Sequence, residues 1–196
     1  MEQKKILQKE LVRKSIHICS SFIPLLLSFL YWPTIAALLA MVIFYSISEF
    51  LRLRNINIPV ISFITKTAAR EKDDGKFVMG PVTLVIGIIL TALMCQKMPC
   101  AIGIFSLAFG DGFASLIGKM FGKRKLPFSR GKTYAGSLGC FIASFISLFL
   151  LTKSSYISLI IAAATTLIES LPLGDFDNII IPTFTGAVAT LLIYGL

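Results

Sequence analysis

Seven long apolar runs follow one another along the chain, separated by short polar segments. An apolar stretch of roughly 17 to 25 residues can cross the hydrocarbon core of a bilayer as an α-helix. The runs therefore predict an all-α, polytopic membrane bundle of about seven transmembrane helices. We place the spans at Ile16 to Trp32, Pro33 to Leu51, Val78 to Cys95, Met98 to Ile117, Ala135 to Leu151, Ser155 to Glu169 and Ile179 to Leu196.

The composition agrees with a chain that folds in lipid. Hydrophobic residues make up 56% of the 196 residues, charged residues only 15%, and the mean hydropathy is +0.84. No linker, repeat or low-complexity stretch divides the sequence, so we expect residues 1–196 to form a single membrane-embedded domain. The first run resembles a secretory signal, but it leads through Pro33 into the second without a small-residue cleavage pattern. We expect it to remain a span.

The basic residues predict the orientation in the membrane. Seventeen of the 19 lysines and arginines lie in three alternate segments, the N-terminal arm, the second loop and the fourth loop. Such residues are retained on the cytoplasmic side, so we expect the N-terminus inside and the C-terminus outside. This placement also explains the net charge of +9, and no nucleic acid partner is expected. The 17 residues are Lys4, Lys5, Lys9, Arg13, Lys14, Arg52, Arg54, Lys66, Arg70, Lys72, Lys76, Lys119, Lys123, Arg124, Lys125, Arg130 and Lys132.

The four cysteines predict no metal site. Cys19, Cys95, Cys100 and Cys140 lack the spacing of metal ligands and lie in or beside apolar runs, where a thiol usually acts as a small hydrophobe. Cys95 and Cys100 flank a predicted outer loop, and a disulfide between them stays open as an alternative.

The stretch FSRGKTYAGS, Phe128 to Ser137, raises the question of a nucleotide site, because Gly-Lys-Thr often ends a phosphate-binding P-loop. The complete motif needs a glycine five positions before Gly131, and that position is Leu126. The motif also belongs between a buried strand and a helix, whereas this stretch precedes an apolar span. The sequence therefore excludes a P-loop and leaves open a phosphate site of another kind.

Asp111 is the polar residue that an apolar span explains least. It lies six residues before the end of the fourth predicted span, roughly 9 Å below the cytoplasmic surface at about 1.5 Å per residue. A carboxylate at that depth needs a cationic partner, a metal ion or a wet cavity, so we expect a functional role. Other polar residues gather at the same face, namely Lys132, Thr133, Glu169, Asp175, Asp177 and Asn178.

The N-terminal arm contributes a second set of polar side chains. The residues that share one face of a helix entering the bilayer are Glu10, Arg13, Lys14 and His17. Arg13 and Lys14 can also be read as topology anchors that snorkel to the interface. We expect His17, the single histidine, to be hydrogen-bonded rather than a ligand. Glu49, three residues before Arg52, predicts a simple helical ion pair.

Several glycines lie close to Asp111 and Lys132 in the sequence, namely Gly110, Gly118, Gly122, Gly131 and Gly136. Glycine at a helix end lets a second backbone or an anionic ligand approach closely, and free N–H groups at the start of a helix favour phosphate. Helix packing through small residues would produce the same pattern. Together with carboxylates and lysines, these residues suit a Mg²⁺-bound polyphosphate.

Five short patterns, taken together, have a counterpart in a known family. They are Asp111-x2-Ala114-x3-Gly118-x3-Gly122-x2-Lys125, Lys132-Thr133-x2-Gly136-Ser137, Glu10-x2-Arg13-Lys14-x2-His17, Glu169-x2-Pro172 and Asp177-Asn178-x3-Pro182. The set covers nearly the whole chain and resembles the dolichol kinase, phytol kinase and CTP-dependent diacylglycerol kinase family. The resemblance implies an integral membrane kinase, and the distribution of basic residues predicts that its active site faces the cytoplasm. Such an enzyme transfers the γ-phosphate of CTP, with Mg²⁺ or another divalent cation, to a lipid alcohol such as diacylglycerol, a polyprenol or phytol.

The resemblance also implies roles for individual residues. The expected catalytic residues are Arg13, Lys14, Asp111, Lys132 and Asp177. The expected nucleotide-binding residues are Gly118, Gly122, Lys125, Lys132, Thr133, Gly136, Ser137 and Asn178. The expected metal ligands are Asp111, Glu169 and Asp177. Whether Asp111 or Asp177 takes the proton of the acceptor hydroxyl stays open.

One position departs from the family pattern, and two other functions remain as alternatives. The family usually has an acidic residue two positions after the threonine, where this chain has Ala135, which puts rate and nucleotide handling in doubt. Nucleotidyl transfer, as in phosphatidate cytidylyltransferases, is the runner-up, although the chain lacks their size and long C-terminal signature. A small transporter is the third reading, but transporters usually bind their substrate near the bilayer midplane, whereas the polar residues here gather at one face.

Overall fold

The computed structural model describes residues 2–56, 75–127, 129 and 131–195. Within these ranges the chain is helical, without a β-strand, and one isolated antiparallel bridge joins Lys125 to Thr133. The elements are α1 (Glu2–Cys19), η1 (Ser20–Phe22), α2 (Ile23–Phe29), α3 (Tyr31–Leu53), α5 (Gly80–Met94), α6 (Lys97–Phe105), η3 (Ser106–Asp111), α7 (Gly112–Phe121), α8 (Tyr134–Thr152), α9 (Ser155–Ser170), η4 (Gly174–Phe176) and α10 (Asp177–Tyr194). The prediction of an all-α bundle is confirmed.

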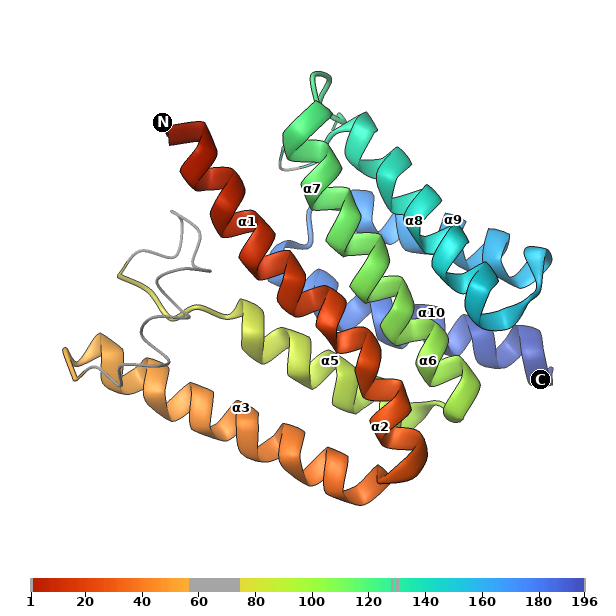
Figure 1. Cartoon of the computed structure of the whole chain (residues 1–196), viewed down its shortest axis with the longest axis horizontal. Coiled ribbons are helices and arrows are strands. Elements are labelled where there is room, and N and C mark those ends of the chain that lie inside the picture. The colour runs from red at the N-terminus through yellow and green to blue at the C-terminus, as the bar shows by residue number, and fades with distance from the viewer. Residues whose placement is uncertain (1, 57–74, 128, 130, 196) are drawn as a thin grey trace.

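Each of the seven predicted apolar runs corresponds to a helical segment. Among the residues that the structure describes, five segments are long and apolar enough to cross a membrane, including Leu7–Phe29 and Lys97–Phe121. The other two, α5 and α9, are shorter at 15 and 16 residues. The N-terminal end of α1 and the C-terminal end of α10 lie at opposite ends of the bundle (Figure 1), because successive segments run in alternating directions.

The first helix begins earlier than the first apolar run, since α1 starts at Glu2 rather than near Ile16. Hydropathy marks where a helix enters lipid, and it gives no signal for the polar turns before that point. The helix bends at η1, where Pro24 in the first turn of α2 has no N–H for the carbonyl four residues earlier. The polar residues of α1 therefore lie on one continuous helix that runs from Glu2 to Cys19.

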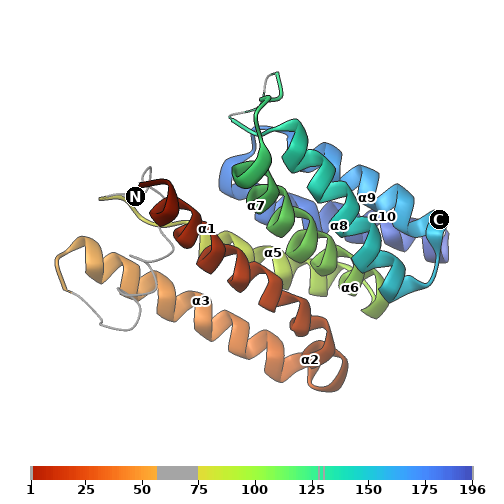
Figure 2. The same ribbon diagram turned by 45° about the horizontal axis from the view of Figure 1, so that its top comes forward.

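The segment Lys97–Phe121 lies at the centre of the bundle. Of its most apolar window 67% is buried, against 22% for each of the first two spans. It packs against α8, α9 and α10, while α1 packs along α7 and α3 lies at the periphery against α5 and α2 (Figure 2). Asp111 is therefore carried by the most enclosed helix of the structure.

The backbone of helix α10 approaches α5 and α6 closely at two glycines. A Cβ atom placed on Gly87 of α5 would lie 2.1 Å from the carbonyl oxygen of Asn178, and one on Gly103 of α6 would lie 2.3 Å from that of Pro182. Such close approach is possible only at glycine, and small residues are the usual means of packing helices in lipid. The start of α10 is thereby held close to α5.

Two further predictions from the sequence can be compared with the structure, and a third cannot. The predicted pair of Glu49 and Arg52 is present, with Arg52 Nη2 2.8 Å from Glu49 Oε1. All four cysteines are free, so the alternative disulfide between Cys95 and Cys100 is not formed. The predicted cytoplasmic residues Lys66, Arg70, Lys72 and Arg130 lie outside the described residues.

Candidate active site

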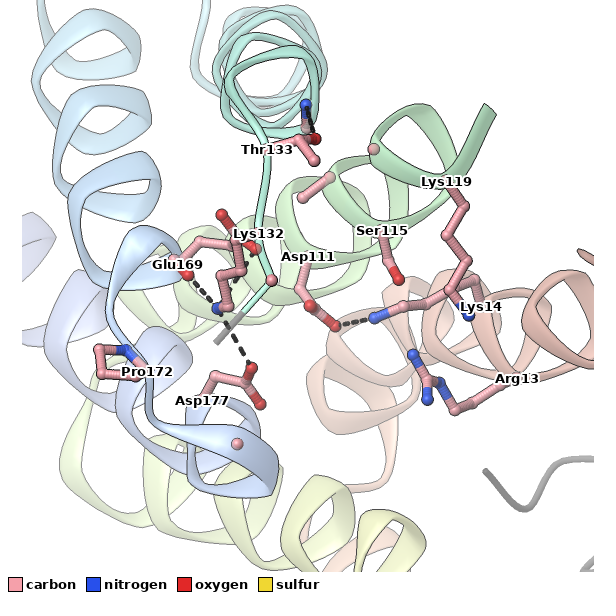
Figure 3. A pocket seen from close by; sticks show the side chains of 15 residues that line it. Arg13, Lys14, Asp111, Ser115, Lys119, Lys132, Thr133, Glu169, Pro172 and Asp177 are labelled. Carbon is pink, nitrogen blue, oxygen red and sulfur yellow. Dashed lines mark hydrogen bonds and ion pairs between the residues drawn. The ribbon is translucent and has the colours of Figure 1, made fainter. Parts of the chain in front are cut away.

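A cavity of about 410 Å³ opens at the end of the bundle where α1 begins. Its walls come from α1, the end of η3, α7, the loop before α8 with the start of α8, and the segment from the end of α9 to the start of α10 (Figure 3). Residues near the N-terminus therefore meet residues of the second half of the chain. The lining residues are Arg13, Lys14, Asp111, Ala114, Ser115, Gly118, Lys119, Gly131, Lys132, Thr133, Gly136, Glu169, Pro172, Gly174 and Asp177.

Asp111 and Lys14 form a buried ion pair on the wall of this cavity. The Lys14 ammonium donates to Asp111 Oδ2, and the two residues are 1% and 6% exposed. His17 Nδ1 lies 3.2 Å from the same oxygen, one turn further along α1. Burial of either charge alone would be strongly unfavourable, so the pair joins α1 to the central helix. Of the three alternatives expected for Asp111, namely a cationic partner, a metal ion or a wet cavity, the structure shows a cationic partner, Lys14.

A π-helical segment sets the direction in which Asp111 points. Residues Ser106–Asp111 form η3, between the α-helical turns of α6 and α7. The wider turn of a π-bulge rotates the residues that follow it, and such bulges are frequent at functional sites. On the same segment a Cβ placed on Gly110 would lie 2.6 Å from Ser144 Oγ of α8, so Gly110 packs against the core. Asp111 is therefore turned towards α1 and the cavity.

Glu10 organises the basic side chains on the α1 side of the cavity. Its buried carboxylate accepts hydrogen bonds from Arg13 and, across the helix interface, from Ser115 and Lys119 of α7. Ser115 and Lys119 lie four and eight residues after Asp111, the spacing of one helix face, and this signal would have identified them from the sequence. Arg13 Nε and Nη1 are buried without a hydrogen bond among the described residues.

Lys132 connects the two carboxylates at the opposite wall. Its Nζ lies 3.3 Å from Glu169 Oε1 and 3.7 Å from Asp177 Oδ2, and it donates to the backbone oxygen of Glu169 (Figure 3). Glu169 Oε2 is buried without a hydrogen bond among the described residues. The preceding residue, Gly131, has a φ of 91°, which favours glycine and turns the chain into the site.

Thr133 and three glycines pack closely between α7 and α8. Thr133 is the N-cap of α8, and its Oγ1 accepts from the N–H of Gly136 at 3.1 Å. A Cβ on Gly122 would lie 2.2 Å from the oxygen of Gly118 and 2.5 Å from Thr133 Oγ1. The glycines therefore serve close packing here, and Gly118 and Gly136 also line the cavity.

Four residues predicted to bind nucleotide do not line the cavity. Lys125 is exposed in the loop after α7. Gly122 packs against Gly118 and Thr133. Ser137 Oγ lies 3.2 Å from Ser170 Oγ of α9. Asn178 points towards α5. Neighbours in sequence such as Asp177 and Asn178 face in different directions on a helix, which a motif does not reveal.

The predicted metal ligands do not form one ready cluster. No group of three His, Cys, Asp or Glu side chains within the described residues is arranged to hold a metal ion. The reason is that lysines stand among the carboxylates: Lys14 is paired with Asp111, and Lys132 bridges Glu169 and Asp177. Four basic side chains and three carboxylates therefore line the cavity.

Comparison with known proteins gives relatives that match nearly all of this chain. It is 31% identical to a probable phytol kinase, chloroplastic, of Zea mays, over 98% of this chain and 70% of that protein. It is 30% identical to phytol kinase 1, chloroplastic, of Arabidopsis thaliana, over 100% and 70%, and 29% identical to the farnesol kinase, chloroplastic, of the same plant, over 96% and 67%. No family model and no solved structure matches the chain. With this similarity along its length, the helical membrane protein described here belongs to the phytol kinase-like family.

Proposed function

We propose that this protein is a CTP-dependent lipid-alcohol kinase whose acceptor is a long-chain alcohol such as phytol or farnesol. One observation carries the proposal: a cavity with four basic side chains and three carboxylates lies at one end of an apolar bundle. A charged phosphate donor and an apolar acceptor can meet only at such a boundary. The names of the relatives support the acceptor class, and the family resemblance of the patterns that contain Asp111 and Lys132 supports CTP.

The basic side chains would hold the triphosphate. Arg13 has two buried nitrogen atoms, Nε and Nη1, without a partner among the described residues, and Lys119 and Lys14 also line the cavity. An ammonium has three N–H donors, so Lys14 can bind a phosphate oxygen while it remains bonded to Asp111. Gly118 and Gly136 pack closely against each other and also line the cavity beside the first turn of α8.

Glu169 and Asp177 fit a divalent cation better than the predicted set of three. Both approach the same Lys132 ammonium within 4 Å, and Glu169 Oε2 lacks a partner among the described residues. Mg²⁺ is commonly held by one or two carboxylates together with phosphate oxygens and water. When bound, the ion would neutralise charge on the β- and γ-phosphates. Lys132 would then turn from the carboxylates to the phosphates.

Asp111 is our proposed proton acceptor, because it is the carboxylate of the three that the cation would leave uncoordinated. The acceptor oxygen forms a bond to the γ-phosphorus, and the bond from that phosphorus to the bridging oxygen of the β-phosphate breaks. CDP leaves with the electron pair, and the hydroxyl proton passes to Asp111. Lys14 holds the carboxylate in place for this step.

The decisive test of the proposal is the position of the transferred label. The purified protein, incubated with Mg²⁺ and a panel of phytol, farnesol, a polyprenol and diacylglycerol, should give labelled lipid from CTP carrying ³²P at the γ-phosphate. CTP labelled at the α-phosphate should give none, because a kinase attacks only the terminal phosphorus. Parallel reactions with γ-labelled ATP, GTP and UTP test the donor.

Label transferred from the α position would contradict kinase chemistry and support nucleotidyl transfer. If no donor labels any acceptor, the result would contradict the kinase proposal and favour the alternative that the protein is a small transporter. A control reaction with the Asp111→Asn variant excludes a contaminating kinase, since background activity would persist in it.

We further propose that the cavity faces the cytoplasm. Single cysteines at Lys125 and Asp175, in a variant without the four native cysteines, should resist a membrane-impermeant thiol reagent in intact cells and react after permeabilisation. A cysteine at Gln96, at the other end of the bundle, should react without permeabilisation. Arg70, in the second basic loop, lies outside the described residues but provides a third position. Labelling of Lys125→Cys in intact cells would contradict the orientation.

A further inference from the structure

Asn178 follows the cavity residue Asp177, but its side-chain amide is used elsewhere. The residue is 4% exposed, and Nδ2 donates to Thr83 Oγ1 at 2.9 Å and to the backbone oxygen of Gly80 at 3.3 Å. Thr83 and Gly80 both belong to α5 and are not among the residues that line the cavity. Both N–H groups of the amide are therefore engaged by a neighbouring helix.

The hydrogen bond between Asn178 and Thr83 has a defined direction. The Thr83 hydroxyl lies 3.0 Å from the oxygen of Gly80, to which it donates its proton. Its oxygen lone pairs are then free to accept from Asn178, and Gly80 can only accept. The network consequently requires a hydroxyl at position 83 and an amide nitrogen at position 178.

The backbone of Asn178 is fixed against the same helix. Pro182, four residues later, has no N–H, so the Asn178 carbonyl lacks its usual bond within α10. That oxygen instead lies over Gly87, where an added Cβ would be 2.1 Å away. The side chain and the main chain of Asn178 thus both contact α5, at Thr83 and at Gly87, which lie one helical turn apart.

Asp177 depends on this anchorage because it occupies the first turn of α10 beside Asn178. Its carboxylate oxygen lies 3.7 Å from Lys132 Nζ at the cavity wall. A small rotation of the first turn about the helix axis would move the carboxylate away from Lys132. Residues that orient a ligand or catalytic group from behind typically change activity or affinity by about 10- to 100-fold when removed.

We propose that Asn178 and Thr83 are positioning residues that hold the Asp177 carboxylate at the cavity, in place of the nucleotide-binding role predicted for Asn178. The inference rests on the proposed function, since it assumes that Asp177 takes part in the reaction. Two helices and a loop are linked in order: α5 orients α10, α10 presents Asp177, and Asp177 meets Lys132 in the loop before α8.

The test uses the pair Thr83→Val and Thr83→Ser. Valine removes the acceptor at nearly constant shape, and we expect kcat to fall about 10- to 100-fold, whereas serine restores the hydroxyl and most of the activity. Thr91→Val is the matched control on the same helix, because the Thr91 hydroxyl bonds only to Gly87 of its own helix among the described residues. It should keep kcat within about twofold at a similar melting temperature.

A double-mutant cycle shows whether Thr83 acts through Asp177. In Asp177→Glu the carboxylate is already displaced by one methylene, so adding Thr83→Val should lower kcat by much less than it does in the parent protein. Full multiplication of the two effects would overturn the inference, and so would equal kcat losses for Thr83→Val and Thr91→Val. Unchanged activity of Asp177→Asn would instead contradict the role of Asp177 in the proposed function, whatever Thr83→Val does.

Discussion

Replacement of Asp111 by asparagine should lower kcat by about 10²- to 10⁴-fold, the range that a general base contributes. The amide has the size of the carboxylate but cannot take a proton from the acceptor hydroxyl. Its Oδ1 can still accept from Lys14, so the contact between α1 and the central helix should persist. The KM for nucleotide should change little. Steady-state kinetics on the purified variant measure both quantities.

Glu49→Gln is the matched control for this change. Glu49 is a second fully buried carboxylate, bonded to Arg52 and to the N–H of Val78, and it does not line the cavity. It should lose stability but keep kcat within a few-fold. Equal kcat losses in both variants would indicate destabilisation as the common cause. Near-normal turnover by Asp111→Asn would leave Asp111 a structural ion pair and make Asp177 the candidate base.

Replacement of Lys132 by methionine should lower kcat/KM by about 10²- to 10³-fold, the usual cost of removing one preorganised charge donor. Lys132 is the residue that can both hold Glu169 and Asp177 together and neutralise charge on the transferred phosphate. Methionine preserves the length and apolar stem of the side chain, so the loss would report the ammonium alone. Kinetics at saturating lipid acceptor separate this effect from acceptor binding.

Lys125→Met provides the comparison within the same loop. Lys125 belongs to the signature but is exposed and outside the cavity, so its variant should keep kcat/KM within a few-fold. Lys132→Arg should fall between the parent and methionine, because a planar guanidinium keeps the charge but not the compact geometry. A loss in Lys125→Met as large as in Lys132→Met would mean that the loop acts through its overall charge.

The fold was largely predictable because lipid imposes it. A run such as Ala135 to Leu151 can satisfy its backbone in the bilayer only as a helix, and α8 covers Tyr134–Thr152. The π-bulge before Asp111 was not predictable, because it depends on how Gly110 packs against α8. The polar start of α1 has no apolar pattern, so the hydropathy of the sequence did not predict that the helix begins at Glu2.

The candidate site was predictable as a set of residues and less so as an arrangement. Charge and glycine patterns indicated that Asp111 and Lys132 lie near the same face, and they meet in one cavity. The hydrogen bonds that Glu10 accepts from Lys119 and Ser115 depend on which faces of α1 and α7 meet, and no local pattern contains that information. Asn178 shows the converse, because its motif position suggested a ligand while its partner, Thr83, lies on another helix.

The two ionic clusters of the cavity can form at different stages of protein synthesis. A chain is synthesised from its N-terminus, so Glu10 and Lys14 can find Lys119 and Asp111 as soon as α7 has emerged. Lys132 must wait for Glu169 and Asp177, more than thirty residues further along the chain. The ion pairs of Glu10 and Lys14 can therefore form before synthesis of the chain is complete. Those of Lys132 form only with the last helix, so a nascent chain that is released early has no complete site with which to act on membrane lipid.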